Sequence, residues 1–228
     1  MEKIILMNAG WLSLVLACAI AGRSERITLP PPIEKSETSV EEAIAKRRTL
    51  RDFHSTPITL EQLSTLCWAG QGITSRERGF PRRSAPSAGA LYPIFLYVAV
   101  GENTVSGLSS GVYKYFPLEH ELKLVIKGEQ RRAIAVASLG QMWMRNPAVN
   151  FIISADYSRI TPKYGKRGIQ YAHFEAGHVA QNIMLEAIAL NLASAIVGAF
   201  SDEEVKKITG LPLGEEALLI LPVGHPAK

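Results

Sequence analysis

The feature that most constrains the fold is a long apolar stretch, residues 171–200, which reads YAHFEAGHVAQNIMLEAIALNLASAIVGAF. Over residues 171–190 the apolar side chains cover nearly the whole circumference of a helix, whereas a surface helix leaves a broad polar face. These apolar positions are Phe174, Ala176, Val179, Ala180, Ile183, Met184, Leu185, Ala187, Ile188 and Leu190. We therefore expect a long buried helix at the centre of a globular core. It should end at Asn191, because asparagine tolerates the left-handed conformation.

A stretch of this length could also span a membrane, so its polar residues decide between the two interpretations. They occur at several depths and are Glu175, His178, Gln181, Asn182 and Glu186. A charged side chain near the centre of a bilayer is costly. The stretch is therefore interpreted as a core helix.

The first 38 residues form two segments of their own. Residues 1–21 combine Lys3, an apolar run and small residues at the end, a pattern typical of an export signal peptide. A lipoprotein signal with lipidation at Cys18 and an uncleaved membrane-associated helix are the alternatives. Residues 22–38 are polar and contain three consecutive prolines, which predicts a linker. We expect an exported or membrane-associated protein, periplasmic or otherwise extracytoplasmic, with a cytoplasmic location as the alternative.

Composition and charge exclude several classes of function. The chain of 228 residues is 47% hydrophobic, which suits one good-sized folded domain, here residues 39–228. The net charge of +4 favours a small anionic ligand over nucleic acid. The only cysteines are Cys18 and Cys67, with no spacing that suits a metal. No GxGxxG or P-loop motif occurs, so a Rossmann or nucleoside-triphosphate site has no support.

The remaining elements follow from capping and periodicity. Capping boxes at residues 39–42 and 59–62 predict two helix starts, and Ser201 to Glu204 predict the start of a helix that stops at Gly210. A short helix is expected around residues 131–139. Strands are predicted at residues 94–100, 112–116, 122–126, 149–155 and 217–223, the second and third forming a hairpin.

Two short stretches are candidates for ligand binding. The first predicted helix ends in Arg47-Arg48-Thr49-Leu50-Arg51, and arginine forks suit phosphate oxygens. A solvated helix terminus explains the same cations, because they oppose the negative end of the helix dipole. The small residues of Ser84 to Ala90 allow close backbone approach to a flat ligand, and a simple turn is the alternative.

Taken together and in this order, several motifs resemble the FMN-dependent nitroreductase superfamily, and most closely its SagB-type dehydrogenase branch. They are Arg47-Arg48-Thr49-Leu50-Arg51, Ala85-Pro86-Ser87-Ala88-Gly89-Ala90-Leu91-Tyr92-Pro93, Lys163-Tyr164-Gly165, Glu175-Ala176-Gly177-His178-Val179-Ala180-Gln181-Asn182 and Val197-Gly198-Ala199-Phe200. The resemblance covers residues 39–226. It implies an α+β fold with a central, mostly antiparallel sheet flanked by helices, and a homodimer with FMN at its interface.

The resemblance also assigns residues to the cofactor. The implied FMN-binding residues are Arg47, Arg48, Thr49, Arg51, Pro86, Ser87, Ala88, Gly89, Val197 and Gly198. Arg47 and Arg48 would meet the phosphate or ribityl chain, and Arg51 the pyrimidine edge of the flavin. Gly198 would lie close to flavin N5, the hydride-accepting atom, although relatives often have an acid where this chain has Val197.

The implied function is electron transfer from NAD(P)H through FMN to a small-molecule acceptor by a ping-pong route. The flavin carries the chemistry, so no side chain is assigned as catalytic. His178 is interpreted as a core or interface histidine, and Lys163 and Tyr164 as possible substrate contacts. Two alternatives stay open: an azoline dehydrogenase of the SagB type, and a flavin-binding subunit of a larger assembly without turnover. The sequence chooses neither the acceptor nor between NADH and NADPH.

Overall fold

The computed structural model describes residues 26–76 and 81–227, which build one seven-stranded sheet. In spatial order its strands are β1 (Arg26–Thr28), β6 (Glu121–Lys127), β5 (Gly111–Phe116), β4 (Ile94–Val100), β7 (Val149–Asp156), β9 (Glu215–Gly224) and β8 (Ala193–Ser194). Neighbouring strands in this sheet are antiparallel. A separate ladder pairs β2 (Ile73–Ser75) with β3 (Arg82–Arg83).

The central strands are buried on both faces of the sheet. In β4, Ile94, Leu96, Val98 and Val100 pack into one apolar cluster, whereas Tyr97 and Ala99 pack into a second cluster on the other face. This alternation follows from the period of two along a strand. The continuous apolar run of residues 94–100 is therefore explained by two cores, one on each side.

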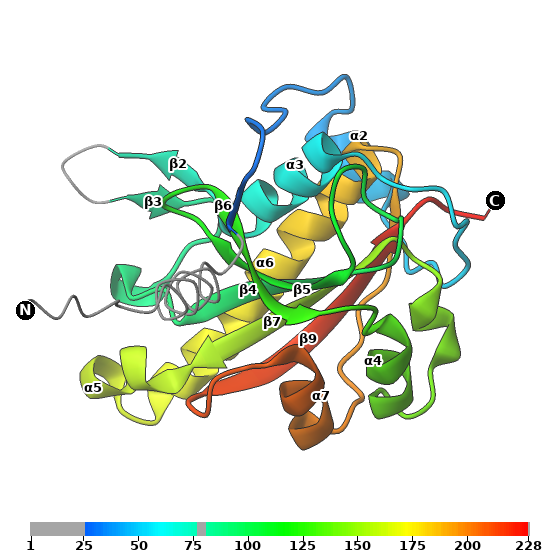
Figure 1. Cartoon of the computed structure of the whole chain (residues 1–228). Coiled ribbons are helices and arrows are strands. Elements are labelled where there is room, and N and C mark those ends of the chain that lie inside the picture. Colours follow the sequence, from blue (N-terminus) through cyan, green and yellow to red (C-terminus); the bar gives the residue numbers. More distant parts are fainter. Residues whose placement is uncertain (1–25, 77–80, 228) are drawn as a thin grey trace, which may run out of the picture.

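Helices cover both faces (Figure 1). On one side lie α2 (Val40–Lys46), α3 (Leu60–Gln71) and α6 (Arg167–Ala189), and on the other α4 (Arg131–Ala137) and α7 (Asp202–Thr209). The short elements are η2 (Ala88–Ala90), η3 (Met142–Arg145), η4 (Tyr157–Arg159) and α5 (Thr161–Tyr164). The α+β class and the antiparallel sheet flanked by helices are confirmed.

The long central helix is present, but it is not buried all round. Its inner face, which includes Ala176, Val179 and Ile183, lies in the core between the sheet and α3. A strip on its outer side is exposed, and Phe174 keeps 57% of its surface accessible. The expected burial around the whole circumference is therefore wrong for this strip. After the helix, Asn191 has φ 57°, as predicted for the residue that ends it.

All three predicted helix starts are confirmed, and two of them also have a side-chain capping hydrogen bond. Thr59 and Gln62 form a complete reciprocal capping box at the start of α3, and the Ser39 hydroxyl accepts from the Glu42 amide at the start of α2. Ser201 precedes α7, but its side chain makes no capping hydrogen bond, so the third cap is wrong. The helix still begins there because three acidic residues occupy its first turn, next to the positive end of its dipole.

The predicted linker, residues 22–38, is partly wrong, because its middle joins the domain. Residues 26–28 form edge strand β1 against β6, and Leu29 is buried. The Pro30 carbonyl accepts a hydrogen bond from the Ser64 hydroxyl and lies 3.0 Å from Nε2 of His120. The segment before α2 is thus held against α3. The signal segment, residues 1–21, lies outside the described residues. Within 26–76 and 81–227 no helix has the length and apolar character needed to cross a bilayer.

Candidate functional site

The basic segment after α2 lies beside the last strand of the sheet. Thr49 forms a bridge with Ser194 of β8, and the Leu50 amide donates to the Ser194 carbonyl at 3.1 Å. Lys46 is paired with Glu42, whereas Arg47 and Arg51 form no ion pair within the described residues. Arg48 is directed back toward the Lys46 carbonyl. The two unpaired guanidinium groups are therefore free to bind an anion.

Val197 and Gly198 continue along the same edge. Val197 pairs with Ile220 in β9, and Ser194 pairs with Val223 of the same strand. These positions on β9 are three residues apart, or about 10 Å at the rise of a strand. Gly198 opens into a polar cavity of about 440 Å³ that is also lined by His173 and Tyr157. The structure thus places Thr49 and Gly198 along one strip of surface.

Side-chain contacts link this strip to the other face of the sheet. The Arg51 guanidinium lies over the Trp143 ring, 5.7 Å from its centroid. Gln141, which precedes η3, donates from Nε2 to the Ala199 carbonyl at 3.3 Å. Three predicted contacts therefore lie on one face of one subunit. They are the phosphate contact of Arg47, the pyrimidine contact of Arg51 and the N5 contact of Gly198.

The loop with Ser87 and Gly89 lies elsewhere. Gly89 has φ 61°, and a Cβ atom there would meet Lys163 Nζ at 2.8 Å and the Tyr164 hydroxyl at 2.9 Å. The Ser87 hydroxyl accepts from the Tyr92 amide at 2.8 Å, which fixes the loop. The left-handed backbone conformation favours glycine here, and the ends of two α5 side chains approach it closely. The loop therefore sits beside α5, before the start of α6.

The predicted flavin residues fall into two groups, the loop with Ser87 and Gly89 and the strip with Gly198. These two groups face opposite sides of α6. Ser87 lies next to Glu175, whereas Gly198 shares a cavity with His173, two residues earlier on the same helix. Two residues correspond to about 200° around a helix with 3.6 residues per turn. Figure 1 also shows α5 and α2 at opposite ends of α6. Within one chain, the loop with Ser87 and Gly89 is therefore separated from Gly198 by α6.

Glu175 is a buried carboxylate that the sequence analysis included in a family motif and as an interruption of the apolar pattern, without assigning it a role. It is 2% exposed, and neither oxygen has a hydrogen-bond partner among the described residues. Burial raises its pKa to about 7, although the Ser87 hydroxyl and the cations Arg83 and Arg159 favour the ionised form. The pattern of helical residues alone gave no sign of these neighbours.

We predict that Glu175→Gln gains stability relative to the wild type as pH rises from 4.5 to about 7. A raised pKa in the folded state means that the folded protein holds this proton more tightly than the unfolded chain does. The resulting stabilisation is complete below the pKa of Glu175 in the unfolded chain. It is lost as pH rises through the pKa of Glu175 in the folded protein. The free energy of unfolding changes by at most about 3 kcal/mol over this range. Urea unfolding across this pH range measures it.

Glu37→Gln, at an exposed glutamate before α2, is the control for Glu175→Gln and should give a much smaller change with pH relative to the wild type. If the difference for Glu175→Gln changes as little, Glu175 does not titrate in this window.

Other sequence candidates take clear places. His178 is exposed and makes no hydrogen bond within the described part of the chain, so its interpretation as a core histidine is wrong and the interface interpretation remains. Cys67 is fully buried, and burial raises the pKa of its thiol well above the usual range, as expected for a core residue. Among residues 26–76 and 81–227, no group of three or more His, Cys, Asp or Glu could hold a metal.

Comparison with known proteins gives the family. A model of the nitroreductase family matches residues 44–225. The chain belongs to the nitroreductase family. The superfamily indicated by the sequence motifs is confirmed, and this nitroreductase-family protein is an oxidoreductase by membership.

Individual relatives agree with this assignment. "Putative nitroreductase MJ1384" of Methanocaldococcus jannaschii is 43% identical over 195 residues, 86% of this chain and 94% of its own length. "Microcin B17-processing protein McbC" of Escherichia coli is 29% identical over 152 residues, 65% of this chain and 56% of its own length. The crystal structure of "a putative nitroreductase" from Ralstonia eutropha JMP134 has a TM-score of 0.77 at 26% identity, and the match covers 91% of this chain and 93% of that one.

Proposed function

We propose that this nitroreductase-family protein is an FMN-dependent oxidoreductase that passes electrons from NAD(P)H to a small-molecule acceptor. The observation that carries the proposal is the strip from Arg47 to Gly198, where two unpaired arginines and an open glycine follow one edge of the sheet. FMN, when bound, supplies the redox chemistry, and the chain supplies orientation and charge. Arg47, Arg48 and Thr49 would hold the phosphate end, and Arg51 and Gly198 the ring.

We also propose that two copies of the chain share each site. Ser87, Ala88 and Gly89 are separated from Gly198 by the width of α6, so the loop that lines a given flavin would come from the partner subunit. A C2 dimer brings such separated patches together twice. The exposed strip of α6, with Phe174 and His178, faces outward as an interface helix would.

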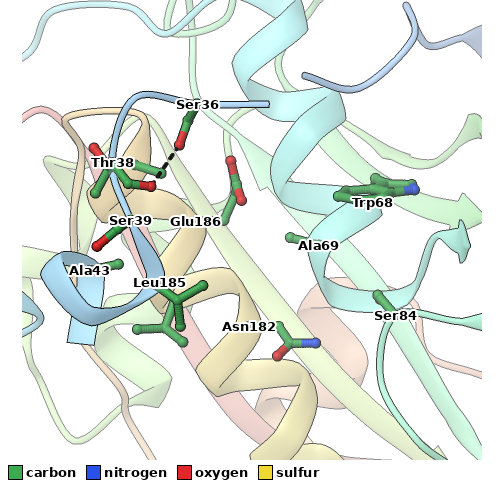
Figure 2. A pocket seen from close by; sticks show the side chains of 12 residues that line it. Ser36, Thr38, Ser39, Ala43, Trp68, Ala69, Ser84, Asn182, Leu185 and Glu186 are labelled. Atoms are coloured by element: carbon green, nitrogen blue, oxygen red, sulfur yellow. Dashed lines mark hydrogen bonds between the residues drawn. The ribbon is translucent and has the colours of Figure 1, made fainter. Parts of the chain in front are cut away.

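A cavity beside α2 supports this dimer. It has a volume of about 290 Å³ and lies between α2, α3 and α6; Figure 2 shows Trp68 and Ala69 on one side and Asn182 and Leu185 on another. At its edge Val40 is 66% exposed, and on the same helix Ile44 is 57% exposed. Apolar side chains left accessible next to a hollow favour contact with another protein surface.

The visible spectrum of the purified protein tests the enzyme proposal. Flavin bands that bleach with NADH or NADPH and recover with a nitro compound or quinone are the expected result. A colourless protein that takes up no FMN on reconstitution would overturn it. Flavin bands that do not bleach would favour the flavin-binding subunit without turnover.

Arg47→Ala is predicted to weaken FMN binding by roughly tenfold or more, because a hydrogen bond to a charged group contributes about 1.5 to 3 kcal/mol. Fluorescence titration of the flavin-free protein measures the affinity. Lys46→Ala is the matched control: it removes the neighbouring cation, which is already paired with Glu42. Equal affinities for the wild type and Arg47→Ala would place the phosphate elsewhere, for example at Arg82 and Arg83.

Mixing two defective variants tests the shared site. Arg47→Ala and Ala88→Asp each affect both flavin sites of their own homodimer. A mixed dimer contains one site with both changes and one site with neither. Equal amounts of the two variants, unfolded and refolded together, should form mixed dimers as about half of all dimers. The mixture should therefore bind about half a flavin per dimer on average. If mixing restores no flavin binding, all ten residues act within one subunit.

A second function is favoured by the processing proteins among the relatives. McbC is named as a processing protein for microcin B17, and the present chain spans about half of its length. The loop with Gly89 holds Lys163 and Tyr164 beside the proposed flavin position, where they could contact an azoline substrate. Oxidation of an azoline peptide by the purified protein alone, followed by mass spectrometry, separates this activity from NAD(P)H-dependent reduction.

The location of the protein is a separate proposal. We propose that residues 1–21 direct export or membrane attachment, on the basis of their apolar composition and small terminal residues. Fractionation of cells that express the full chain, with mass spectrometry of the mature N-terminus, distinguishes cleavage after Ala21 from lipidation at Cys18. Recovery of the intact chain in the cytoplasmic fraction would overturn the proposal.

A further inference from the structure

The sheet contains a gap between two of its central strands. β4 and β5 pair from Val100 and Gly111 to Tyr97 and Lys114. Beyond that point β4 continues only along β7, and β5 only along β6. A cavity of about 250 Å³ occupies the wedge where they separate, lined by residues of both strands and by Gln71, Arg83 and Arg159.

Two arginines give this wedge a positive charge. Arg83 donates from Nη1 to Gln71 Oε1 at 2.7 Å, and its guanidinium lies 4.5 Å from the centroid of the Tyr92 ring. Arg159 lies over the Phe95 ring at 5.3 Å and has no ion pair within the described residues. Burial lowers the pKa of Arg83, and the like charge of Arg159 lowers it further. Two cations are thus held close together.

Three acids lie around the wedge, and they are distributed unequally among its cations. Lys114, which also lines the cavity, is paired with Glu215 at 2.7 Å. Glu119 is an exposed residue of the loop after β5. Among the described acids, Glu175 is the one that interacts with both arginines, and it is not part of the cavity wall. Arg83 and Arg159 therefore share the single carboxylate of Glu175. An anionic ligand inside the wedge could bind both guanidinium groups.

A buried donor without a partner also points into this region. Gln71 is 1% exposed, and its Nε2 has no hydrogen-bond partner among the described residues. The Arg83 guanidinium has only donors, so the atom of Gln71 that it contacts must be the acceptor Oε1. The Gln71 amide nitrogen is then left without a partner in the described part of the chain. A buried unsatisfied donor is costly, so a ligand oxygen here would remove a penalty that the chain otherwise carries.

We propose that the wedge between β4 and β5 binds a small aromatic carboxylate, with its carboxylate toward Arg83, Arg159 and the Gln71 amide. Most of the other wall residues are apolar or aromatic, with Phe95 and Tyr115 on the two separating strands, and the charged ones are Lys114 and Glu119. Because Arg83, Arg159 and the Gln71 amide are donors left for a ligand, and Lys114 is already paired with Glu215, the cavity suits a ligand with one anionic end and a flat apolar body. A phosphate would leave oxygens facing apolar walls without partners.

Calorimetric titration of the purified protein with sodium benzoate tests this site, with benzamide as the neutral analogue and inorganic phosphate as the other anion. Benzoate should bind at one site per chain, and benzamide and phosphate at least about tenfold more weakly. The same benzoate affinity is expected with and without FMN, because no wall of the cavity comes from the predicted flavin residues. This independence separates the site from the proposed function.

Arg159→Gln should weaken benzoate binding by about tenfold or more, since it removes one charged donor. Arg132→Gln, at an exposed arginine of α4, is the matched control and should leave binding unchanged. Gln71→Leu, which removes the amide donor, should also weaken binding. The proposal is overturned if benzoate does not bind, if benzamide binds equally well, if binding requires FMN, or if Arg159→Gln has no effect.

Discussion

Replacing Glu215 by alanine is expected to lower the free energy of unfolding by about 3 to 5 kcal/mol, the range for removal of one partner from a buried ion pair. Glu215 is 5% exposed and accepts hydrogen bonds from Lys114 Nζ at 2.7 Å, the Tyr97 hydroxyl at 2.9 Å and the Ser154 hydroxyl at 2.8 Å. Its loss leaves an ammonium group and two hydroxyls without their acceptor between the sheet and α7. Urea unfolding of the two proteins gives the difference.

Glu121→Ala is the control for this experiment. Glu121 also accepts from a cation, Arg26, at 3.1 Å, but that pair lies at the exposed edge of the sheet. Exposed pairs contribute at most about 1 kcal/mol, so this variant should change stability little. Similar losses for both variants would mean that water reaches Glu215 in the folded protein.

Gly198→Val is expected to reduce the rate of flavin reduction by NAD(P)H on the order of a hundredfold, because a displacement of about an ångström at the reacting centre has an effect of that size. The chain itself tolerates a side chain at this position: the atom nearest to a Cβ there is Leu219 Cδ2, at 3.9 Å. A loss of rate would therefore come from the ligand beside Gly198 rather than from damage to the fold. Stopped-flow measurement of flavin bleaching gives the rate.

His178→Ala serves as the comparison for Gly198→Val and should retain appreciable reduction. Both variants need their bound FMN measured first, so that loss of cofactor is not mistaken for loss of rate. If the histidine variant is inactive with its flavin in place and the glycine variant is active, the assigned roles are wrong.

The elements that were predicted correctly are those whose signal is local. Residues 94–100 are a continuous apolar run, residues 149–155 are apolar except for Asn150 and Ser154, and Thr59 with Gln62 carries its own capping chemistry. The two strands at the edges of the sheet were missed because β1 has three residues and β8 has two. Strands this short have no periodicity to detect, and only their partners in the folded chain define them.

The candidate site divides in the same way. Motif resemblance collected the ten predicted flavin residues, but it could not show that Ser87 and Gly198 face opposite sides of α6. Glu175 and Arg83 are far apart in sequence, so no local pattern relates them. Electrostatic neighbours of this kind depend on the tertiary structure, and sequence patterns do not contain them.

The pairing of β1 has a consequence for the order of events during synthesis on the ribosome. Arg26 pairs with Lys123, 97 residues later in the chain. Translation at about 5 to 20 residues per second needs roughly 5 to 20 seconds to cover that distance. During this interval β1 has no strand to join. This edge of the sheet can therefore close only after about half of the chain has been synthesised.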